Sequence, residues 1–416
     1  MVGVEKLKKI YHEFPQKFWL VVAVSFIDGI GATLLFPFFS LYITQKFNVG
    51  MTQAGIILGI FSIFGLVGGI IGGALSDKFG RRKLILFGLI SSALSTLSLG
   101  FVNNFATLYP LAILIGLLSS IGSPAHSAMI ADILPEKQRQ EGYGILRVVS
   151  NMSWIIGPSI GGYIANKSFL TLFVLDAIIS CLVAVLFYFL ISETKPVSPN
   201  VQKEMNVIST FKGYGTVLRD FSFMAFLIAG MLMGSVYQQM YNSLSVYLRD
   251  YHHIQPQGYG FLLTISAITV ILFQFTITRI IKHRPPFIMM ALGSIFYMIG
   301  FSMFGFVSTY ELFALAIVVI TIGEMIIMPT TQALAANFAP EDMRGRYMAV
   351  YGLTWAIPAT IGPSAAGVIL DNYNPNLLWF IGGFLCILSA FSFYILHFRI
   401  GAQKRFSPAS DEIPSE

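Results

Sequence analysis

Five ionisable side chains interrupt long apolar stretches of this chain, and their types suit proton or ion binding. Asp28, His126, Arg147, Asp176 and Glu324 each lie several residues inside such a stretch. Asp176 is expected to satisfy a neighbouring helix and not to contact substrate. Placing an ionisable group in the membrane interior costs at least about 2.5 kcal/mol on insertion scales, so each is expected to have a function or a partner. A carboxylate in a medium of low dielectric constant holds its proton more tightly and is able to exchange it near neutral pH. Asp28 and Glu324 are therefore the candidates for proton coupling.

Each candidate also has a structural interpretation. Asp28 could hydrogen-bond to Arg147 or to the backbone beside Gly29, and Glu324 could pair with an opposing helix. Arg147 could instead bind an anionic substrate, although we favour its pairing with Asp28. These alternatives make the same residues sensitive to substitution for different reasons.

Two of the apolar stretches contain clusters of polar residues, and the first cluster surrounds His126. His126 could shuttle protons, or it could be a neutral, packed histidine bonded to Ser123 or Ser127. A second group lies close together with Tyr241 in one stretch and consists of Tyr237, Gln238, Gln239 and Asn242. Such clusters are expected where a helix lines a water-filled path.

The composition places these residues in a membrane protein. Hydrophobic residues make up 55% of the chain and charged residues 11%, against about 25% charged residues in soluble domains. Stretches of about 20 apolar residues are long enough to span the hydrocarbon core, and twelve predict an all-α membrane protein. The predicted spans are Phe18–Ile43, Thr52–Ser76, Leu84–Val102, Thr107–Leu134, Gly142–Ala165, Phe169–Ser192, Phe221–Leu248, Gly258–Ile281, Pro286–Val307, Glu311–Phe338, Tyr347–Leu370 and Leu377–His397.

The basic residues predict the orientation of the spans. Of the 26 Lys and Arg residues, 22 fall in the segments that are cytoplasmic if the N-terminus is inside, and three fall in the outside loops. Cytoplasmic loops of membrane proteins are enriched in Lys and Arg. Both termini of this multi-pass protein of the cell membrane are therefore predicted to be cytoplasmic.

The chain repeats itself at an offset of 205 residues. Cys181 falls on Cys386, Gly55 on Gly260, and the pair Gly157–Pro158 on Gly362–Pro363. An offset that holds along the whole chain indicates two pseudo-symmetric six-helix halves. The predicted parts are residues 1–192, a cytoplasmic linker at 193–220, residues 221–398, and a polar cytoplasmic tail at 399–416.

A short basic turn joins the second and third spans. It contains Gly73, Asp77, Lys78, Gly80, Arg81 and Arg82. Gly80 permits a tight turn, and Asp77 can cap a nearby helix start or pair with a base. Asp132, at the inner end of the fourth span, is expected to pair with Arg139 or with this turn.

This spacing, G-x-x-x-D-[RK]-x-G-R-[RK], resembles the loop 2–3 signature of the major facilitator superfamily. The resemblance covers about residues 15–398 and implies that helices 1, 4, 7 and 10 line a central cavity. It also implies that the loop stabilises one conformation of the protein, in addition to fixing the orientation of the neighbouring helices in the membrane.

Two further segments resemble exporters of that family. The fifth predicted span carries Gly157, Pro158, Gly161 and Gly162, which resemble the helix 5 motif of exporters. Small residues and proline there allow close helix packing or a hinge. The segment around Glu324, G-E-M-I-I-M-P, looks like helix 10 of several multidrug exporters, in which an acidic residue serves protons or cationic substrates.

We therefore expect a secondary transporter that works by alternating access, with proton-coupled efflux of drug-like or amphipathic small molecules as the leading function. Uptake or exchange of a small nutrient is the alternative, and a non-transporting membrane sensor is a remote one. The sequence contains no nucleotide-binding motif, metal cluster or nucleophile–base set, so no enzyme activity, cofactor or metal is expected. The expected partners are substrate, protons and lipid, without nucleic acid, and the protein is expected to act as a monomer.

Overall fold

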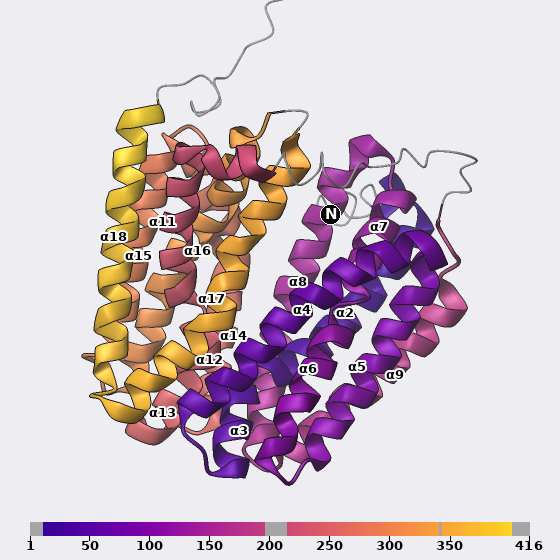
Figure 1. Ribbon diagram of the computed structural model, residues 1–416, viewed down its shortest axis with the longest axis horizontal. Coiled ribbons are helices and arrows are strands. Elements are labelled where there is room, and N and C mark those ends of the chain that lie inside the picture. Colours follow the sequence, from indigo (N-terminus) through magenta and orange to yellow (C-terminus); the bar gives the residue numbers. More distant parts are fainter. Residues whose placement is uncertain (1–10, 196–213, 341–342, 402–416) are drawn as a thin grey trace, which may run out of the picture. The chain divides into compact units, whose positions relative to one another are not determined.

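The computed structural model describes residues 11–195, 214–340 and 343–401, and its regular elements in those ranges are all helices (Figure 1). The first helices are α2 (Gln16–Leu35), η1 (Phe36–Phe38), α3 (Phe39–Phe47), α4 (Met51–Phe79), α5 (Arg81–Phe101), η2 (Phe105–Thr107), α6 (Leu108–Ser119), α7 (Ser123–Ile133), α8 (Glu136–Ala165) and α9 (Phe169–Leu190). The later ones are α11 (Phe221–Tyr237), α12 (Gln239–Asn242), α13 (Leu244–His252), α14 (Pro256–Ile281), α15 (Pro286–Phe304), α16 (Tyr310–Phe338), α17 (Arg344–Asn372) and α18 (Asn376–Ile400).

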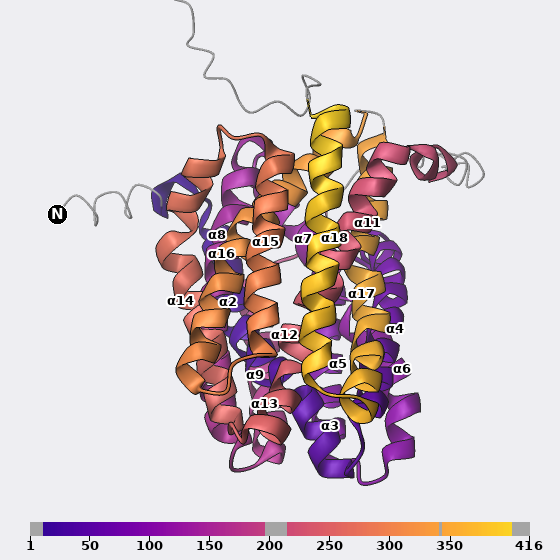
Figure 2. The ribbon, with the colours of Figure 1, turned by 90° about the vertical axis from the view of Figure 1, so that its left-hand side faces the viewer.

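The helices form two compact units. The described residues within Met1–Val49, Ile57–Pro199 and Gln255–Thr264 belong to the first, and those within Gly50–Ile56, Asn200–Ile254 and Ile265–Glu416 to the second. In the first unit α2 packs against α8 and α9, and α5 packs against α9. In the second unit α15 lies beside both α16 and α18 (Figure 2). The expected all-helical membrane fold is confirmed.

Eleven helical segments in the described chain are long and apolar enough to cross a membrane. They correspond to eleven of the twelve predicted spans. The remaining prediction, at Gly142–Ala165, lies within α8, which has 30 residues and begins at Glu136. Its first turns carry several charged residues, so its composition differs from that of the others.

Three of the spans that were predicted to be continuous helices are interrupted in the structure. Pro37 lies in the 3-10 turn η1 between α2 and α3, where a residue without a backbone N–H interrupts the α-helical ladder. The fourth span is divided between α6 and α7, just before Pro124. The seventh is divided at Gln238, within its polar cluster. Backbone groups freed at such breaks are tolerated where protein or water re-satisfies them.

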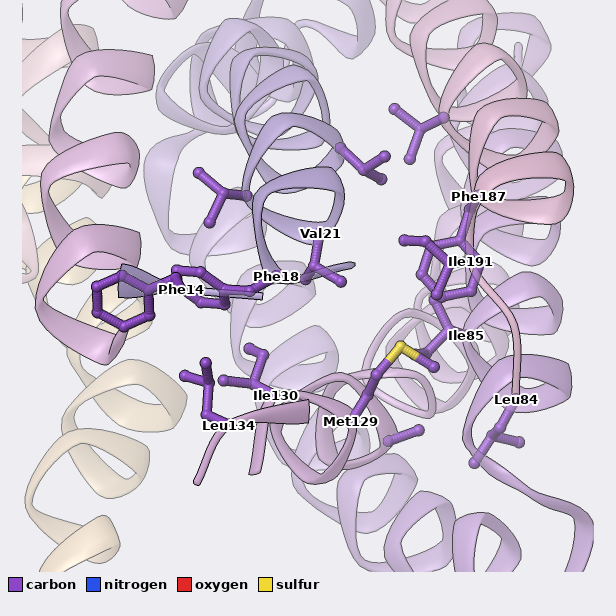
Figure 3. Close-up of a cluster of buried hydrophobic side chains, with 14 of the residues drawn as sticks. Phe14, Phe18, Val21, Leu84, Ile85, Met129, Ile130, Leu134, Phe187 and Ile191 are labelled. Carbon is purple, nitrogen blue, oxygen red and sulfur yellow. The ribbon is translucent and has the colours of Figure 1, made fainter. Parts of the chain in front are cut away.

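The core of the first unit gathers side chains from α2, α5, α7 and α9 (Figure 3). Phe18 and Val21 on α2 belong to one buried cluster with Met129 and Ile130 on α7 and Phe187 on α9. All of these side chains are at most 2% exposed. This apolar cluster holds in place the helices that carry Asp28 and His126.

The internal repeat is visible as one contact made twice. In the first unit, a Cβ on Gly260 of α14 would overlap the carbonyl oxygen of Pro158 in α8. In the second unit, a Cβ on Gly55 of α4 would overlap the backbone of Pro363 in α17. Each glycine lets two helices meet at backbone distance, and the two contacts are related by the predicted offset of 205 residues.

Candidate functional site

A polar cavity of about 490 Å³ lies inside the first unit. Its volume is in the range of small-molecule sites. Its lining combines apolar residues with one carboxylate, one imidazole and many hydroxyls. The polar lining residues are Ser25, Asp28, Ser92, Ser119, Ser123, His126, Ser127, Tyr143 and Ser150. Two candidates from separate predicted spans, Asp28 and His126, thus face the same space.

His126 is joined to α2 through a hydroxyl. Its Nε2 lies 2.9 Å from the Oγ of Ser25, one turn before Asp28. The expected partners Ser123 and Ser127 are on His126's own helix, and no hydrogen bond joins either of them to the ring within the described residues. That part of the prediction is wrong because packing of α7 against α2 brings the ring to another helix.

Asp28 has an acidic neighbour in place of the expected basic one. It interacts electrostatically with Asp176 of α9, which is 6% exposed and interacts with the hydroxyl of Thr96 on α5. Arg147 on α8 is exposed, and in the described part of the chain it forms no ion pair with Asp28. The expected Asp28–Arg147 pair is therefore absent from this structure, and Asp176 interacts with Thr96 on the neighbouring helix α5.

The second unit places Glu324 among aromatic side chains. Glu324, half-buried in α16, interacts electrostatically with Tyr237, Tyr241 and Tyr297. The Tyr237 and Tyr241 hydroxyls lie 3.0 Å apart. The rings of Tyr237 and Tyr297 stack at 5.8 Å between centroids with planes 5° apart.

One more aromatic residue completes this group. Trp355 of α17 packs edge-on against Tyr237 at 6.1 Å. The hydroxyl of Tyr297 is buried without a hydrogen-bond partner in the described structure. We call Tyr237, Tyr241, Tyr297 and Trp355 the aromatic box. Faces of such rings carry negative potential and attract cations, and a carboxylate beside them adds to that attraction.

The other polar residues of the seventh span behave differently. Gln239 is buried, donates to the Ser235 carbonyl at 2.9 Å and accepts from the Ser243 hydroxyl at 2.7 Å. Asn242 is also buried, whereas Gln238 is half-buried at the break between α11 and α12. The amide of Gln239 thus secures the broken helix locally, whereas Tyr237 and Tyr241 interact with Glu324.

The basic turn between α4 and α5 is held by ion pairs and a helix cap. Arg81 bonds to Asp77 at 2.9 Å and to Asp132 at 3.3 Å, which confirms the expected pairing of Asp132 with this turn. Gly80 has φ of +97°, a conformation that favours glycine. Arg82 donates to the Tyr188 carbonyl, and its guanidinium stacks 4.8 Å from the Tyr188 ring. Lys78 and Gly73 lie near the end of α4, where the Lys78 carbonyl accepts from Lys195.

Glu193, which no sequence motif identifies, caps α5. Its carboxylate accepts from the backbone N–H groups of Arg81 at 2.9 Å and Arg82 at 3.1 Å. Partial burial alone would raise the pKa of Glu193, but N–H donors from Lys195, Arg81, Arg82 and Thr194 outweigh it and lower the pKa. No motif spacing connects positions 81 and 193, so only the fold reveals this contact.

The glycines of the fifth predicted span serve close packing within the first unit. Gly157 lies against Thr33 and Gly161 against the Leu34 carbonyl, so α8 contacts α2 at backbone distance. A Cβ on Gly162 would lie 2.7 Å from the Pro256 carbonyl oxygen at the start of α14. Pro158 lies between these positions inside α8. The packing interpretation of this motif therefore has direct contacts behind it.

Known proteins resemble this chain along most of its length. A sequence family described as the Major Facilitator Superfamily matches residues 21–363 and 239–415. A Na(+), Li(+), K(+)/H(+) antiporter of Planococcus maritimus is 27% identical, over 86% of this chain and 89% of its own. Multidrug resistance protein 2 of Bacillus subtilis (strain 168) is 25% identical, over 92% and 95%. The crystal structure of a POT family transporter in complex with 5-aminolevulinic acid has the same fold, with a TM-score of 0.79, 18% identity, and coverage of 92% of this chain and 96% of that one.

Proposed function

The chain belongs to the major facilitator superfamily, and from this premise we propose that it exports drug-like or amphipathic organic cations in exchange for protons. The family and the transporters that share its fold establish a multi-pass membrane transporter and not an enzyme. The direction of transport, the proton and the substrate class are our proposal. Alternating access would bring the substrate site to each side of the membrane in turn.

The observation that carries the proposal is Glu324 beside the aromatic box. A cation over the face of Tyr or Trp gains about 0.5–2 kcal/mol, more when water is excluded. Glu324 can carry either a proton or the charge that attracts the cation, so the two compete for one carboxylate. The relatives named for multidrug resistance and for exchange of metal cations against protons support an antiport mechanism.

Proton flux in proteoliposomes tests this proposal. Vesicles holding the protein are given an imposed pH gradient, and tetraphenylphosphonium, ethidium or a neutral sugar is added outside. We expect the two organic cations to evoke proton movement and the sugar to evoke none. Glu324→Gln should abolish that movement, because the amide neither binds a proton nor attracts a cation.

A matched variant separates the carboxylate's role from general damage. Glu311 is an exposed carboxylate in the first turn of the same helix, α16, so Glu311→Gln should keep full coupling. Proton movement that survives in Glu324→Gln would contradict the proposal. Solute accumulation driven by protons, with the sugar in place of the cations, would instead support the nutrient-uptake alternative.

A further inference from the structure

A second carboxylate accompanies Asp28 in the first unit. Asp176 on α9 points at α2, because its Oδ1 lies 2.9 Å from the position that a Cβ would occupy on Gly31. Residues three apart on a helix share a face, so Gly31 is on the same side of α2 as Asp28. The electrostatic interaction between Asp28 and Asp176 agrees with this geometry. A glycine at position 31 therefore lets the second carboxylate approach the first.

No base neutralises this pair in the described part of the chain. The ion pairs found there involve other residues. Among the elements packed against α2, α7 carries the titratable group His126, and α8 carries Tyr143 and Arg147. The 3-10 turn η1 carries no titratable group. His126 contacts Ser25, Tyr143 donates to the Ser127 carbonyl at 3.1 Å, and Arg147 is exposed.

The two carboxylates differ in what surrounds them. Asp28 lines the polar cavity, whereas Asp176 is 6% exposed and interacts with the Thr96 hydroxyl. An ionised carboxylate accepts from a hydroxyl, so Thr96 favours the charged form of Asp176. Two neighbouring carboxylates in a medium of low dielectric constant cannot both ionise cheaply, and one proton between them relieves the repulsion.

We propose that Asp28 and Asp176 hold a single proton, that Asp28 exchanges it with the cavity, and that Asp176 is the positioning residue whose charge retains it there. This inference rests on the proposed proton coupling and adds a residue to it. On release, the Asp28 carboxylic acid becomes a carboxylate and its proton passes to water in the cavity. Asp176 keeps its negative charge throughout.

Two substitutions should move the pH dependence in opposite directions. Asp176→Asn removes the negative charge that retains the proton, so the pH at half-maximal tetraphenylphosphonium-driven proton flux should fall by about one unit. Thr96→Val removes the hydroxyl that favours charged Asp176, so that pH should rise. Asp176→Glu should keep a profile close to that of the native protein. A structural role would lower transport in all three variants without opposite shifts, and that result would overturn the proposal.

Infrared titration in the absence of substrate tests the proton pair separately from transport. The native protein should show a carbonyl-stretch band of one protonated carboxyl group near neutral pH, and Asp28→Asn should lose it. In Asp176→Asn the band should titrate at lower pH than in the native protein. If the native protein shows no carbonyl-stretch band that is lost in Asp28→Asn, the proton pair is overturned, even if cations drive proton flux. A native protein with the band and without cation-driven flux would refute the proposed function and keep the pair. Loss of the band on adding Na⁺ in place of choline would assign the site to a metal cation and overturn the proton assignment.

Discussion

At the scale of single residues, the structure distinguishes two kinds of polar group in the membrane interior. Gln239 donates from its amide nitrogen to one neighbouring turn of the broken helix and accepts at its amide oxygen from the other. Tyr237 instead joins two helices and the environment of Glu324 through its ring and its hydroxyl. The first kind stabilises a broken helix, and we propose the second kind as a surface that binds a ligand.

Substitutions at Tyr237 should separate its ring from its hydroxyl. Tyr237→Leu removes a cation–π contact worth about 0.5–2 kcal/mol, so the dissociation constant for tetraphenylphosphonium should rise roughly 2- to 30-fold. Tyr237→Phe keeps the ring and loses only the bond to Tyr241, so its affinity should stay within about 3-fold of the native value. Equilibrium binding to the detergent-solubilised protein measures both. Equal losses in the two variants would point to the hydroxyl and against the aromatic box.

The sequence predicted the acidic members of these sites better than their surroundings. Asp28 and Glu324 stand out because a charge in an apolar span is costly. Tyr297 and Trp355 do not, since aromatic residues are common in such spans and neither is at helical spacing from position 324. Their proximity comes from packing of α11 against α17 and of α15 against α16, which local patterns do not encode.

At the scale of elements, the start of α5 depends on a residue from beyond α9. Glu193 caps two backbone N–H groups at the end of the Gly80 turn. Anionic groups at a helix N-terminus are favourable because they satisfy free N–H donors and the helix dipole. The first residues after α9 are thereby fastened to the turn that carries the family signature.

Glu193→Gln should lower stability modestly and in a pH-dependent way. The side chain is exposed, so solvent screening limits the expected loss at pH 7 to about 0.5 kcal/mol. Because the pKa of Glu193 is lower in the folded protein than its usual 4.5, this contribution is present above pH 4.5 and is lost as the pH falls through the folded value. Melting temperatures of both proteins should converge in acid. Glu141→Gln, a change of an exposed carboxylate on α8, serves as the control, and a difference that persists unchanged in acid would contradict the cap.

Helix positions were predictable from apolar length, but helix interruptions were not. The predicted spans match helices because about 20 apolar residues and the turns between them leave few other solutions. The breaks at η1, before α7 and at Gln238 arise where proline or a polar cluster meets neighbouring helices that accommodate the freed backbone. Sequence shows that proline is present, and packing decides whether the helix bends or ends there.

At the scale of the whole molecule, the number of membrane crossings depends on α8. Eleven helical segments in the described chain qualify as spans by length and apolar composition, while α8 has the length but begins with charged turns. An even number of crossings puts both termini on one side, and an odd number puts them on opposite sides. The distribution of Lys and Arg predicts an even number, so α8 is expected to cross.

Labelling at the two ends of α8 tests this expectation. Lys137 lies in its first turn and Lys167 just beyond its end, where the amine donates to the Tyr163 hydroxyl at 2.8 Å. In a background with Cys181 and Cys386 replaced by serine, Lys167→Cys should react with a membrane-impermeant maleimide on intact cells, and Lys137→Cys only in inverted vesicles. The positive-inside rule sets this order, because the first turn of α8 carries Arg139 as well as Lys137, whereas no other basic residue lies near Lys167 in the sequence. Reaction of both cysteines from the same side would mean that α8 does not cross, and would contradict the even number of crossings that the distribution of Lys and Arg predicts.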